Sequence, residues 1–277
     1  SSIVSNTAHT GGGVSNGGTL TITDSTVSGN TADNMGGGVY NWEESTLTIA
    51  NGTVSGNAAS SYGGGICNNS GTVTITNSTI VGNSTHSSGG GLYSYSTRMA
   101  TLGNSIVSGN TAQTGNEVYD QRGTVNANAY NLFGHGGESD VDAFSNFSPA
   151  ANDINATSDG DSVDLDAILD TTLLNDAGDT ETHALVAGSP AIDAGDPDFT
   201  PSPQYDQRGP DYQREVGGRI DIGAYEYGAG PSEAQPVGGV TRPIALLALL
   251  RPWIALAVLL ALTLGSAAFL SRPHRQS

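Results

Sequence analysis

The sequence contains a single cysteine, no lysine and little positive charge, and each scarcity excludes a class of protein. Cys67 has no partner in the chain, so neither an internal disulfide nor a cysteine-based metal cage can form. We expect it to be a buried, unreactive thiol. The nine basic residues, all arginines, face 27 acidic residues and leave a formal net charge of −18. Such a chain is repelled by nucleic acid, which is therefore not expected as a partner.

The first 130 residues carry little charge and are rich in glycine, serine, threonine and asparagine. Their β-branched residues and frequent glycine turns favour short strands over helices. So polar a stretch is also typical of disorder, but disordered segments do not show the regular repeat found here.

Three sequence anchors recur in a fixed order, at intervals of 25 to 27 residues. They are a glycine-rich turn with an aliphatic residue (36–39), an aliphatic-x-aliphatic strand (47–49), and an aliphatic residue before Ser-Gly-Asn (54–57). This pattern predicts an all-β fold over residues 1–120, a right-handed parallel β-helix with three strands per coil and a 26- to 27-residue repeat. Coiling places equivalent residues about 4.8 Å apart, so Val, Ile and Leu form continuous internal columns.

Polar residues recur in register at the turns of this repeat. Stacked amides can hydrogen-bond along the axis, and asparagine tolerates left-handed backbone, so we interpret these columns as structural. An exposed ligand-binding row is the alternative. The columns are Asn30, Asn57, Asn83 and Asn110 after the third strand, Asp24, Asn51, Asn77 and Asn104 after the second, and Asn16, Asn41, Asn68, Ser94 and Asp120 after the first.

A column of larger side chains follows the first strand, made of Tyr40, Cys67, Tyr93 and Tyr119. Alternation along a strand places them on the outer face of the β-helix. We favour plain packing on that face, with binding of sugar rings by the stacked aromatics as the alternative.

A dense acidic segment could bind calcium, which is the one cofactor that the sequence suggests. Asp159, Asp161, Asp164 and Asp166 supply hard oxygen ligands at close spacing, which suits calcium. Their spacing departs from an EF-hand loop, and a solvated acidic loop is the preferred interpretation. His183, the one histidine in its neighbourhood, is expected to form structural hydrogen bonds.

The repeats resemble those of polymorphic outer-membrane proteins, through the triple-glycine turns and the aliphatic-Ser-Gly-Asn-Thr-Ala segments at 27–32 and 107–112. The second half resembles the choice-of-anchor Q domain of bacterial surface proteins, which implies a secreted, surface-held protein and no known catalytic residues. Asp176-Ala177-Gly178 replaces the family's usual Asn-Gly-Gly, and Arg214 or Arg219 supplies its expected arginine. The motifs are, in order, Asn-Leu-Phe-Gly (131–134), Thr-His-Ala-Leu (182–185) with Gly-Ser-Pro-Ala-Ile-Asp-Ala-Gly (188–195), Asp-Gln-Arg-Gly (206–209) and Asp-Ile-Gly-Ala-Tyr-Glu (221–226).

Residues 121–229 are expected to continue or cap the β-helix, because an open end would expose unpaired strand edges. Within this region Arg208 is expected to pair with a carboxylate and lock a loop, with Asp221 or Asp193 as the candidate partner.

The C-terminus has the composition of a membrane anchor. A Gly/Pro/Ser linker covers residues 230–242, and an apolar segment at 243–270 is long enough, at about 27 Å for its last 18 residues, to cross a bilayer as a helix. The basic tail at 271–277 predicts a cytoplasmic C-terminus and an external β-helix. A cleaved sorting signal is the alternative. Because the sequence begins inside a repeat, we also expect an N-terminal part to be missing.

The expected function follows from these features. A β-helix that cuts polysaccharides needs carboxylates clustered on one face, and the acids of the repeats do not stack in register. The sequence therefore predicts a non-enzymatic, cell-surface-anchored β-helix, adhesin-like or a structural stalk, with the membrane and glycans or other surface ligands as partners. The alternative is a polysaccharide lyase or glycoside hydrolase whose active site lies in the missing N-terminal part.

Overall fold

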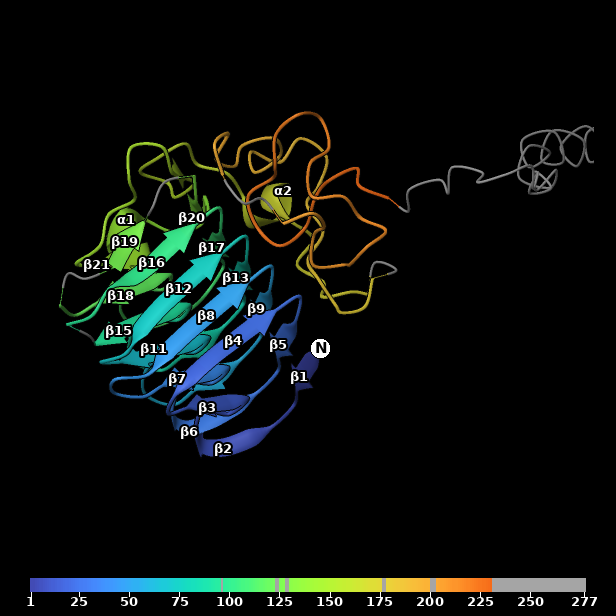
Figure 1. Cartoon of the computed structure of the whole chain (residues 1–277). Coiled ribbons are helices and arrows are strands. Elements are labelled where there is room, and N and C mark those ends of the chain that lie inside the picture. Colours follow the sequence, from blue (N-terminus) through green and yellow to red (C-terminus); the bar gives the residue numbers. More distant parts are fainter. Residues whose placement is uncertain (96, 123–124, 128–129, 176–177, 200–202, 231–277) are drawn as a thin grey trace, which may run out of the picture. The chain divides into compact units, whose positions relative to one another are not determined.

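The computed structural model describes residues 1–95, 97–122, 125–127, 130–175, 178–199 and 203–230. In this part of the chain, parallel strands stack into a β-solenoid of about six turns (Figure 1). The predicted all-β fold with parallel stacked strands is confirmed. Helix is confined, within these residues, to the single turns α1 (Asp140–Ala143) and α2 (Leu165–Ile168).

Four sheets, rather than the three that were predicted, run along the solenoid in the described residues. Three of them contain the predicted strands. The fourth lies between the third predicted strand and the next glycine turn, as in Thr31–Met35. Periodicity missed it because its strands carry small and polar residues and show no aliphatic alternation.

The strands of each sheet are as follows. The seven-stranded sheet consists of β1 (Ser2–Val4), β5 (Thr26–Ser28), β9 (Thr53–Ser55), β13 (Thr79–Val81), β17 (Ile106–Ser108), β20 (Leu132–Phe133) and β22 (Ile154–Asn155). The six-stranded sheet consists of β3 (Val14–Asn16), β7 (Val39–Asn41), β11 (Ile66–Asn69), β15 (Leu92–Tyr95), β18 (Val118–Asp120) and β21 (Phe144–Ser145). The five-stranded sheet consists of β4 (Thr19–Thr23), β8 (Thr46–Ala50), β12 (Thr72–Thr76), β16 (Ala100–Gly103) and β19 (Val125–Ala127), and the four-stranded sheet of β2 (Thr7–Thr10), β6 (Thr31–Met35), β10 (Ala58–Ala59) and β14 (Ser84–Thr85).

The register of the strands confirms the predicted repeat. Val27 pairs with Val54, Val54 with Ile80, and Ile80 with Val107, at steps of 26 or 27 residues. These four side chains are buried and belong to one central core that runs through the coils. Each coil therefore buries these aliphatic residues in a core that it shares with the coils on either side of it.

The strands β19 to β22, between residues 125 and 155, continue the solenoid, because each pairs with a strand of the coil before or after it. After Asn155 the chain leaves the stack, and the described residues among 156–230, which we call the side layer, pack along the seven-stranded sheet (Figure 1). Val81, Ile106 and Leu132 of that sheet point away from the central core and form a second apolar cluster with the side layer.

The predicted linker, apolar segment and basic tail, from residue 231 onward, lie outside the described residues. Among the residues that are described, none of the helices has the length and apolar character needed to traverse a bilayer.

Candidate functional site

The column after the third strand forms a buried amide ladder. The side-chain oxygen of Asn57 accepts hydrogen bonds from both the backbone N and Nδ2 of Asn30, at 3.0 and 2.9 Å. In the same way, the side-chain oxygen of Asn83 accepts both bonds from Asn57, and that of Asn110 accepts both from Asn83. All four side chains are buried, so this ladder satisfies backbone groups at the turns and offers nothing to a ligand.

The column after the second strand has left-handed backbone, with φ between +46° and +55° at Asp24, Asn51, Asn77 and Asn104. These residues also contact the side layer. Asn51 Nδ2 donates to Asp24 Oδ1 and to the Tyr205 carbonyl, at 2.9 and 2.8 Å. The column after the first strand forms a third ladder, in which Asn16 donates to Asn41 and Asn41 to Asn68.

A pocket of about 430 Å³ lies between the second column and the side layer. Asn51 Oδ1 and Asn77 Oδ1 are buried there without a hydrogen-bond donor. Of its two acids, Asp206 is held in an ion pair, so the pocket does not present two free carboxylates. Its lining includes Thr23, Asp24, Asn51, Asn77, Phe199, Tyr205 and Asp206.

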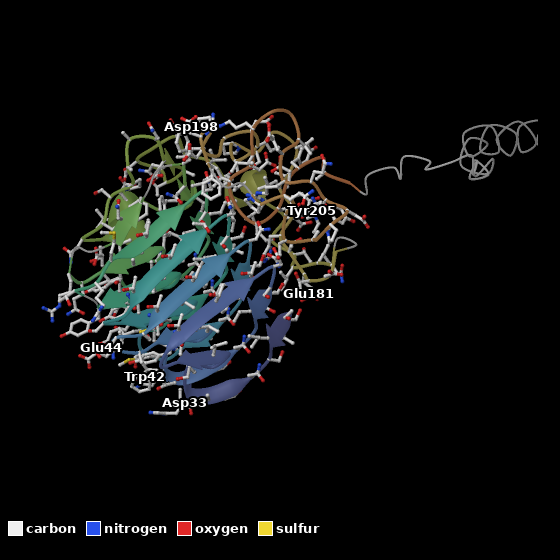
Figure 2. All side chains as sticks on the ribbon, in the orientation of Figure 1. Asp33, Trp42, Glu44, Glu181, Asp198 and Tyr205 are labelled. Carbon is white, nitrogen blue, oxygen red and sulfur yellow. The ribbon has the colours of Figure 1, made fainter. Side chains whose placement is uncertain are left out.

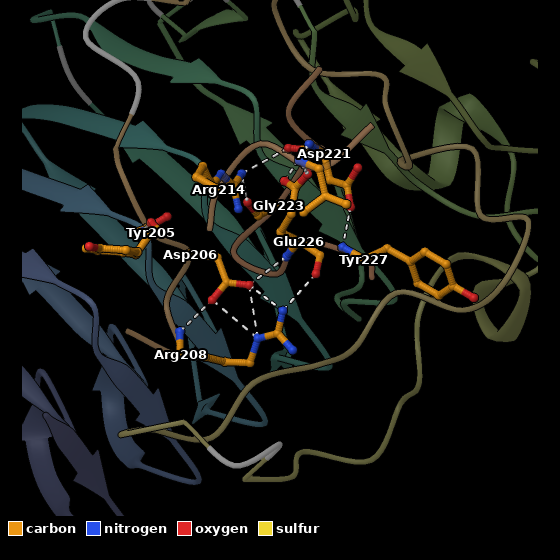
Figure 3. A network of polar contacts seen from close by, with 10 residues as sticks. Tyr205, Asp206, Arg208, Arg214, Asp221, Gly223, Glu226 and Tyr227 are labelled. Atoms are coloured by element: carbon orange, nitrogen blue, oxygen red, sulfur yellow. Dashed lines mark hydrogen bonds and ion pairs between the residues drawn. The ribbon is translucent and has the colours of Figure 1, made fainter. Parts of the chain in front are cut away.

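Arg208 forms its ion pair with Asp206, at 2.6 Å between Nη2 and Oδ2, and both side chains are buried. The prediction of Asp221 or Asp193 as its partner is therefore wrong, because the carboxylate comes from the same tight turn. The guanidinium also donates to the Glu226 carbonyl at 2.7 Å (Figure 3). It lies over the Tyr225 ring, 3.7 Å from the centroid. The loop-locking role is supported by these contacts.

Asp221 belongs to the same polar network but binds backbone groups instead of Arg208 (Figure 3). Its carboxylate accepts the backbone N–H groups of Asp193 and Tyr227. The fully buried Arg214 donates to the carbonyls of Asp221 and Gly223, at 2.9 and 2.6 Å. Burial raises the pKa of Asp221 above its ordinary value.

Glu226 completes the network. Its two carboxylate oxygens accept the backbone N–H groups of Val216 and Asp221. Burial raises the pKa of Glu226 to about 8, although Arg214 nearby acts in the opposite direction. Because these acids and arginines are all buried, we interpret the network as structural.

The side layer is attached to the solenoid by side-chain hydrogen bonds. Gln207 Oε1 accepts from Thr53 Oγ1 at 2.6 Å, and Gln207 Nε2 donates to Thr26 Oγ1 at 2.9 Å. His183 Nε2 lies 2.7 Å from Ser55 Oγ. The structural role predicted for His183 is consistent with this contact.

The acidic segment does not form a gathered site. Asp159, Asp161, Asp164 and Asp166 are all exposed. Residues 159–161 lie in a turn, and Asp164 holds the N-cap position of α2 without a side-chain capping bond. The Asp159 carboxylate accepts the Asp140 backbone N–H at 2.8 Å. No three of them come within 4.8 Å of one another. These aspartates are close together in the sequence, which suggested a calcium site, but their carboxylates do not come together in the structure.

The tyrosine and cysteine column lies outside the central core, as predicted, but it is buried rather than open. Tyr40, Cys67 and Tyr93 are 3%, 0% and 7% exposed. Met35, the last residue of β6 in the fourth sheet, and Tyr62, which forms a bridge with Met35, pack against them. Burial raises the pKa of Cys67, which agrees with the unreactive thiol expected from the sequence.

Around this column, three tyrosine rings stack on one another, and a separate pair of rings meets edge-on. Tyr62 stacks on Tyr93 with centroids 4.7 Å apart, and Tyr93 stacks on Tyr119 at 5.3 Å. Trp42, which is 45% exposed, meets Tyr40 edge-on at 4.7 Å. Figure 2 shows Trp42 well away from Tyr205 of the side layer, so this face of the solenoid is not covered by that layer.

A pocket of about 220 Å³ opens beside the stack, and we call it the tyrosine pocket. Polar groups lie at its rim: Tyr93 Oη donates to Gln121 Oε1 at 2.6 Å, and Arg122 Nη2 donates to Tyr95 Oη at 2.7 Å. Sequence reasoning missed Tyr62, Tyr95 and Gln121 because they lie outside the repeated column. The lining is Met35, Tyr62, Cys67, Asn69, Tyr93, Tyr95 and Gln121.

Sequence reasoning also missed a cluster of Glu117, His135 and Glu138. One signal pointed to it: Glu117 stands where earlier coils have the third glycine of the turn. No family model matches the chain, and comparison with curated proteins gives no match either.

Proposed function

We propose that this protein is a non-enzymatic, right-handed β-helix held at a bacterial cell surface, where its tyrosine pocket binds a saccharide. The observation that carries the proposal is an exposed pocket with aromatic walls and polar groups at its rim. The right-handed sense follows the strong preference of parallel β-crossovers.

The pocket has the chemistry that sugars require. Tyr62 and Tyr95 line the pocket and would offer aromatic surface to the C–H face of a sugar ring. One face of Tyr62 is stacked on Tyr93, and the Arg122 guanidinium lies 4.6 Å from the centroid of the Tyr95 ring. The amides of Asn69 and Gln121 and the Arg122 guanidinium are near enough to bond its hydroxyl groups. At about 220 Å³ the pocket is below the usual range for drug-sized ligands, which favours a single terminal sugar.

Burial of the two close carboxyl pairs described above supports a binding role over hydrolysis at those pairs. Glu117 lies beside Glu138, and Asp221 beside Glu226, and all four residues are buried. A polysaccharide has no access to such groups, whereas a glycosidase needs two carboxyls on either side of the bond it cuts.

The cell-surface location rests on the sequence. The resemblance to the choice-of-anchor Q domain and the apolar segment at 243–270 both support a protein held outside the cell by its C-terminus. A structural stalk without any ligand is the nearest competing function.

A glycan array probed with the full chain tests the proposal. We expect binding to a restricted set of glycans, reduced at least tenfold by Tyr95→Ala or Gln121→Ala. Tyr227→Ala is the matched control, because Tyr227 is a 39% exposed tyrosine of the side layer. Absence of any binding would favour the stalk, and release of reducing sugars from a polysaccharide would favour an enzyme.

A further inference from the structure

Glu117 interrupts the glycine pattern of the solenoid at the point where the asparagine ladder ends. In the preceding coil, a Cβ added to Gly91 would lie 2.9 Å from Asn110 Nδ2, so a side chain at this position faces the ladder. Glu117 Oε1 accepts from Asn110 N at 3.2 Å, and its Oε2 accepts from Asn110 Nδ2 at 2.5 Å. A carboxylate thus takes the place that the next asparagine of the ladder would occupy.

A second carboxyl lies against the first. Glu138 is only 7% exposed, and its Oε2 accepts from Asn116 Nδ2 at 3.0 Å. Its other oxygen, Oε1, is buried and has no hydrogen-bond donor. Burial and the neighbouring Glu138 raise the pKa of Glu117 well above its ordinary value. Two carboxylates offer each other only acceptors, so the pair needs a proton or a cation between them.

A histidine closes the third side of this cluster. Each of Glu117, His135 and Glu138 offers one ligand atom, and the three atoms lie within 4.8 Å of one another. A zinc ion about 2.0–2.2 Å from each ligand needs ligand atoms no more than about 4.4 Å apart, so a small contraction is enough. His135 is half-buried, and its Nδ1 accepts from the Gly137 N–H at 3.0 Å, a bond that an ion bound at Nδ1 would replace.

We propose that Glu117, His135 and Glu138 form a binding site for a single divalent transition-metal ion, with zinc as the best match. An imidazole with two carboxylates suits zinc, whereas calcium takes six to eight oxygen ligands. Two negative charges would balance the ion, and the ion would give the unpartnered Glu138 oxygen its partner. The site does not depend on the tyrosine pocket, and it would tie the fifth coil to the loop before α1.

Calorimetric titration of the full chain, stripped of metal with EDTA and held in a mild detergent because of its apolar segment, tests the site. We expect zinc to bind one to one and to raise the melting temperature, and cobalt to give a visible absorption band. Calcium should bind at least a hundredfold more weakly. No heat with zinc, manganese or cobalt would overturn the proposal and leave a carboxyl pair that shares a proton.

Substitutions locate the ligands. Glu138→Gln and His135→Gln should each weaken zinc binding at least tenfold, and His135 lies in a loop where the exchange should not affect folding. His86→Gln, on an exposed histidine, and Asp161→Asn, in the acidic segment, are the matched controls and should bind zinc like the wild type. Wild-type affinity in both ligand variants, or loss in the controls, would place the ion elsewhere and refute the assignment.

Discussion

The solenoid and the side layer are held together by different means, although they belong to one chain. In the solenoid, neighbouring coils pair through regular parallel strands, and an amide ladder repeats the same bonds in successive coils from Asn30 to Asn110. The side layer contributes isolated antiparallel bridges such as Leu169–Leu185 and relies on buried side chains instead. Arg208, Asp206 and Gln207 each make several contacts that no other residue duplicates.

This difference shows where each region is vulnerable. A repeated contact can be lost in one coil while its neighbours still hold the stack, since each coil is stabilised by its neighbours. A buried ion pair has no substitute, and its loss leaves a charge without compensation. The side layer should therefore respond to single substitutions more sharply and more locally than the solenoid does.

The largest expected effect comes from Arg208→Met, which leaves the Asp206 carboxylate buried without its cation. We expect a cost of roughly 3–5 kcal/mol in the stability of the side layer. Hydrogen exchange should show lost protection at residues 204–227 and unchanged protection in β8 and β12. The double variant Asp206→Asn with Arg208→Met should regain part of the loss, because it leaves no unpaired charge. A single variant that costs less than about 1 kcal/mol would contradict the role given to this pair.

Asn83→Ala tests the solenoid by the same logic. This substitution removes the hydrogen bonds that the Asn83 side chain makes with the backbone N–H of Asn57 and with the carbonyl of Val54. Each buried group left without its partner costs about 1–3 kcal/mol, so we expect the free energy of unfolding, measured with denaturant, to fall by roughly 2–4 kcal/mol. Asn34→Ala, outside the ladder, is the control. Equal losses in the two variants would show that the ladder adds nothing beyond packing.

The side layer and the coils that contain β8 and β12 should also differ in pH dependence. Glu117, the buried solenoid acid with a raised pKa, lies in a later coil. Glu226 binds its proton more tightly in the folded state, with a pKa of about 8 against an ordinary 4.5. The folded side layer therefore holds more protons than the unfolded chain between these values, and its stability falls as pH rises through that window. Hydrogen exchange at pH 5 and pH 8 should show this loss at residues 204–227 but not in β8 or β12. Glu226→Gln should flatten the dependence, and an unchanged slope would rule Glu226 out as its source.

The smallest effect on stability is expected when one glycine in each region is replaced by alanine. Gly56 in the solenoid and Gly188 in the side layer both have positive φ, at +62° and +85°, and a Cβ on either would meet no atom within 4 Å. An alanine at either position costs only the left-handed backbone penalty, about 1–2 kcal/mol. Equal losses in thermal unfolding would show that turns behave alike in both regions. A larger loss at Gly188 would show that the side layer is the stiffer of the two.

The repeat made most of the solenoid predictable. Val27, Val54, Ile80 and Val107 pair as their spacing predicted, because only one register keeps every aliphatic side chain inside. The left-handed backbone at Asn51 and Asn77 likewise agrees with their place at the turns. A structural feature that recurs in successive coils leaves a periodic pattern, and such a pattern can be recognised in a single sequence.

Contacts that occur once could not be read in this way. Arg208 pairs with Asp206 through a local turn of the side layer, where no periodicity limits the choice of partner. Glu117 stands at a repeat position, but Glu138 lies 21 residues later, a spacing that differs from the repeat, and the two meet because the chain turns after β20. The tyrosine column was placed outside the core correctly, but its cover by Tyr62 comes from a strand region without a recognisable pattern.

The attachment of the side layer limits how the gene can change its length. A duplication of 26 or 27 codons adds one coil and keeps every column in register. The side layer, however, bonds Thr26, Thr53, Thr79 and Asn104 on four successive coils, through Gln207, Ala224 and Asp196. A coil inserted among these would displace the later attachment points by about 4.8 Å and separate them from their partners. Duplications should therefore accumulate ahead of Thr26, while the stretch from Thr26 to Asn104 keeps a fixed number of coils.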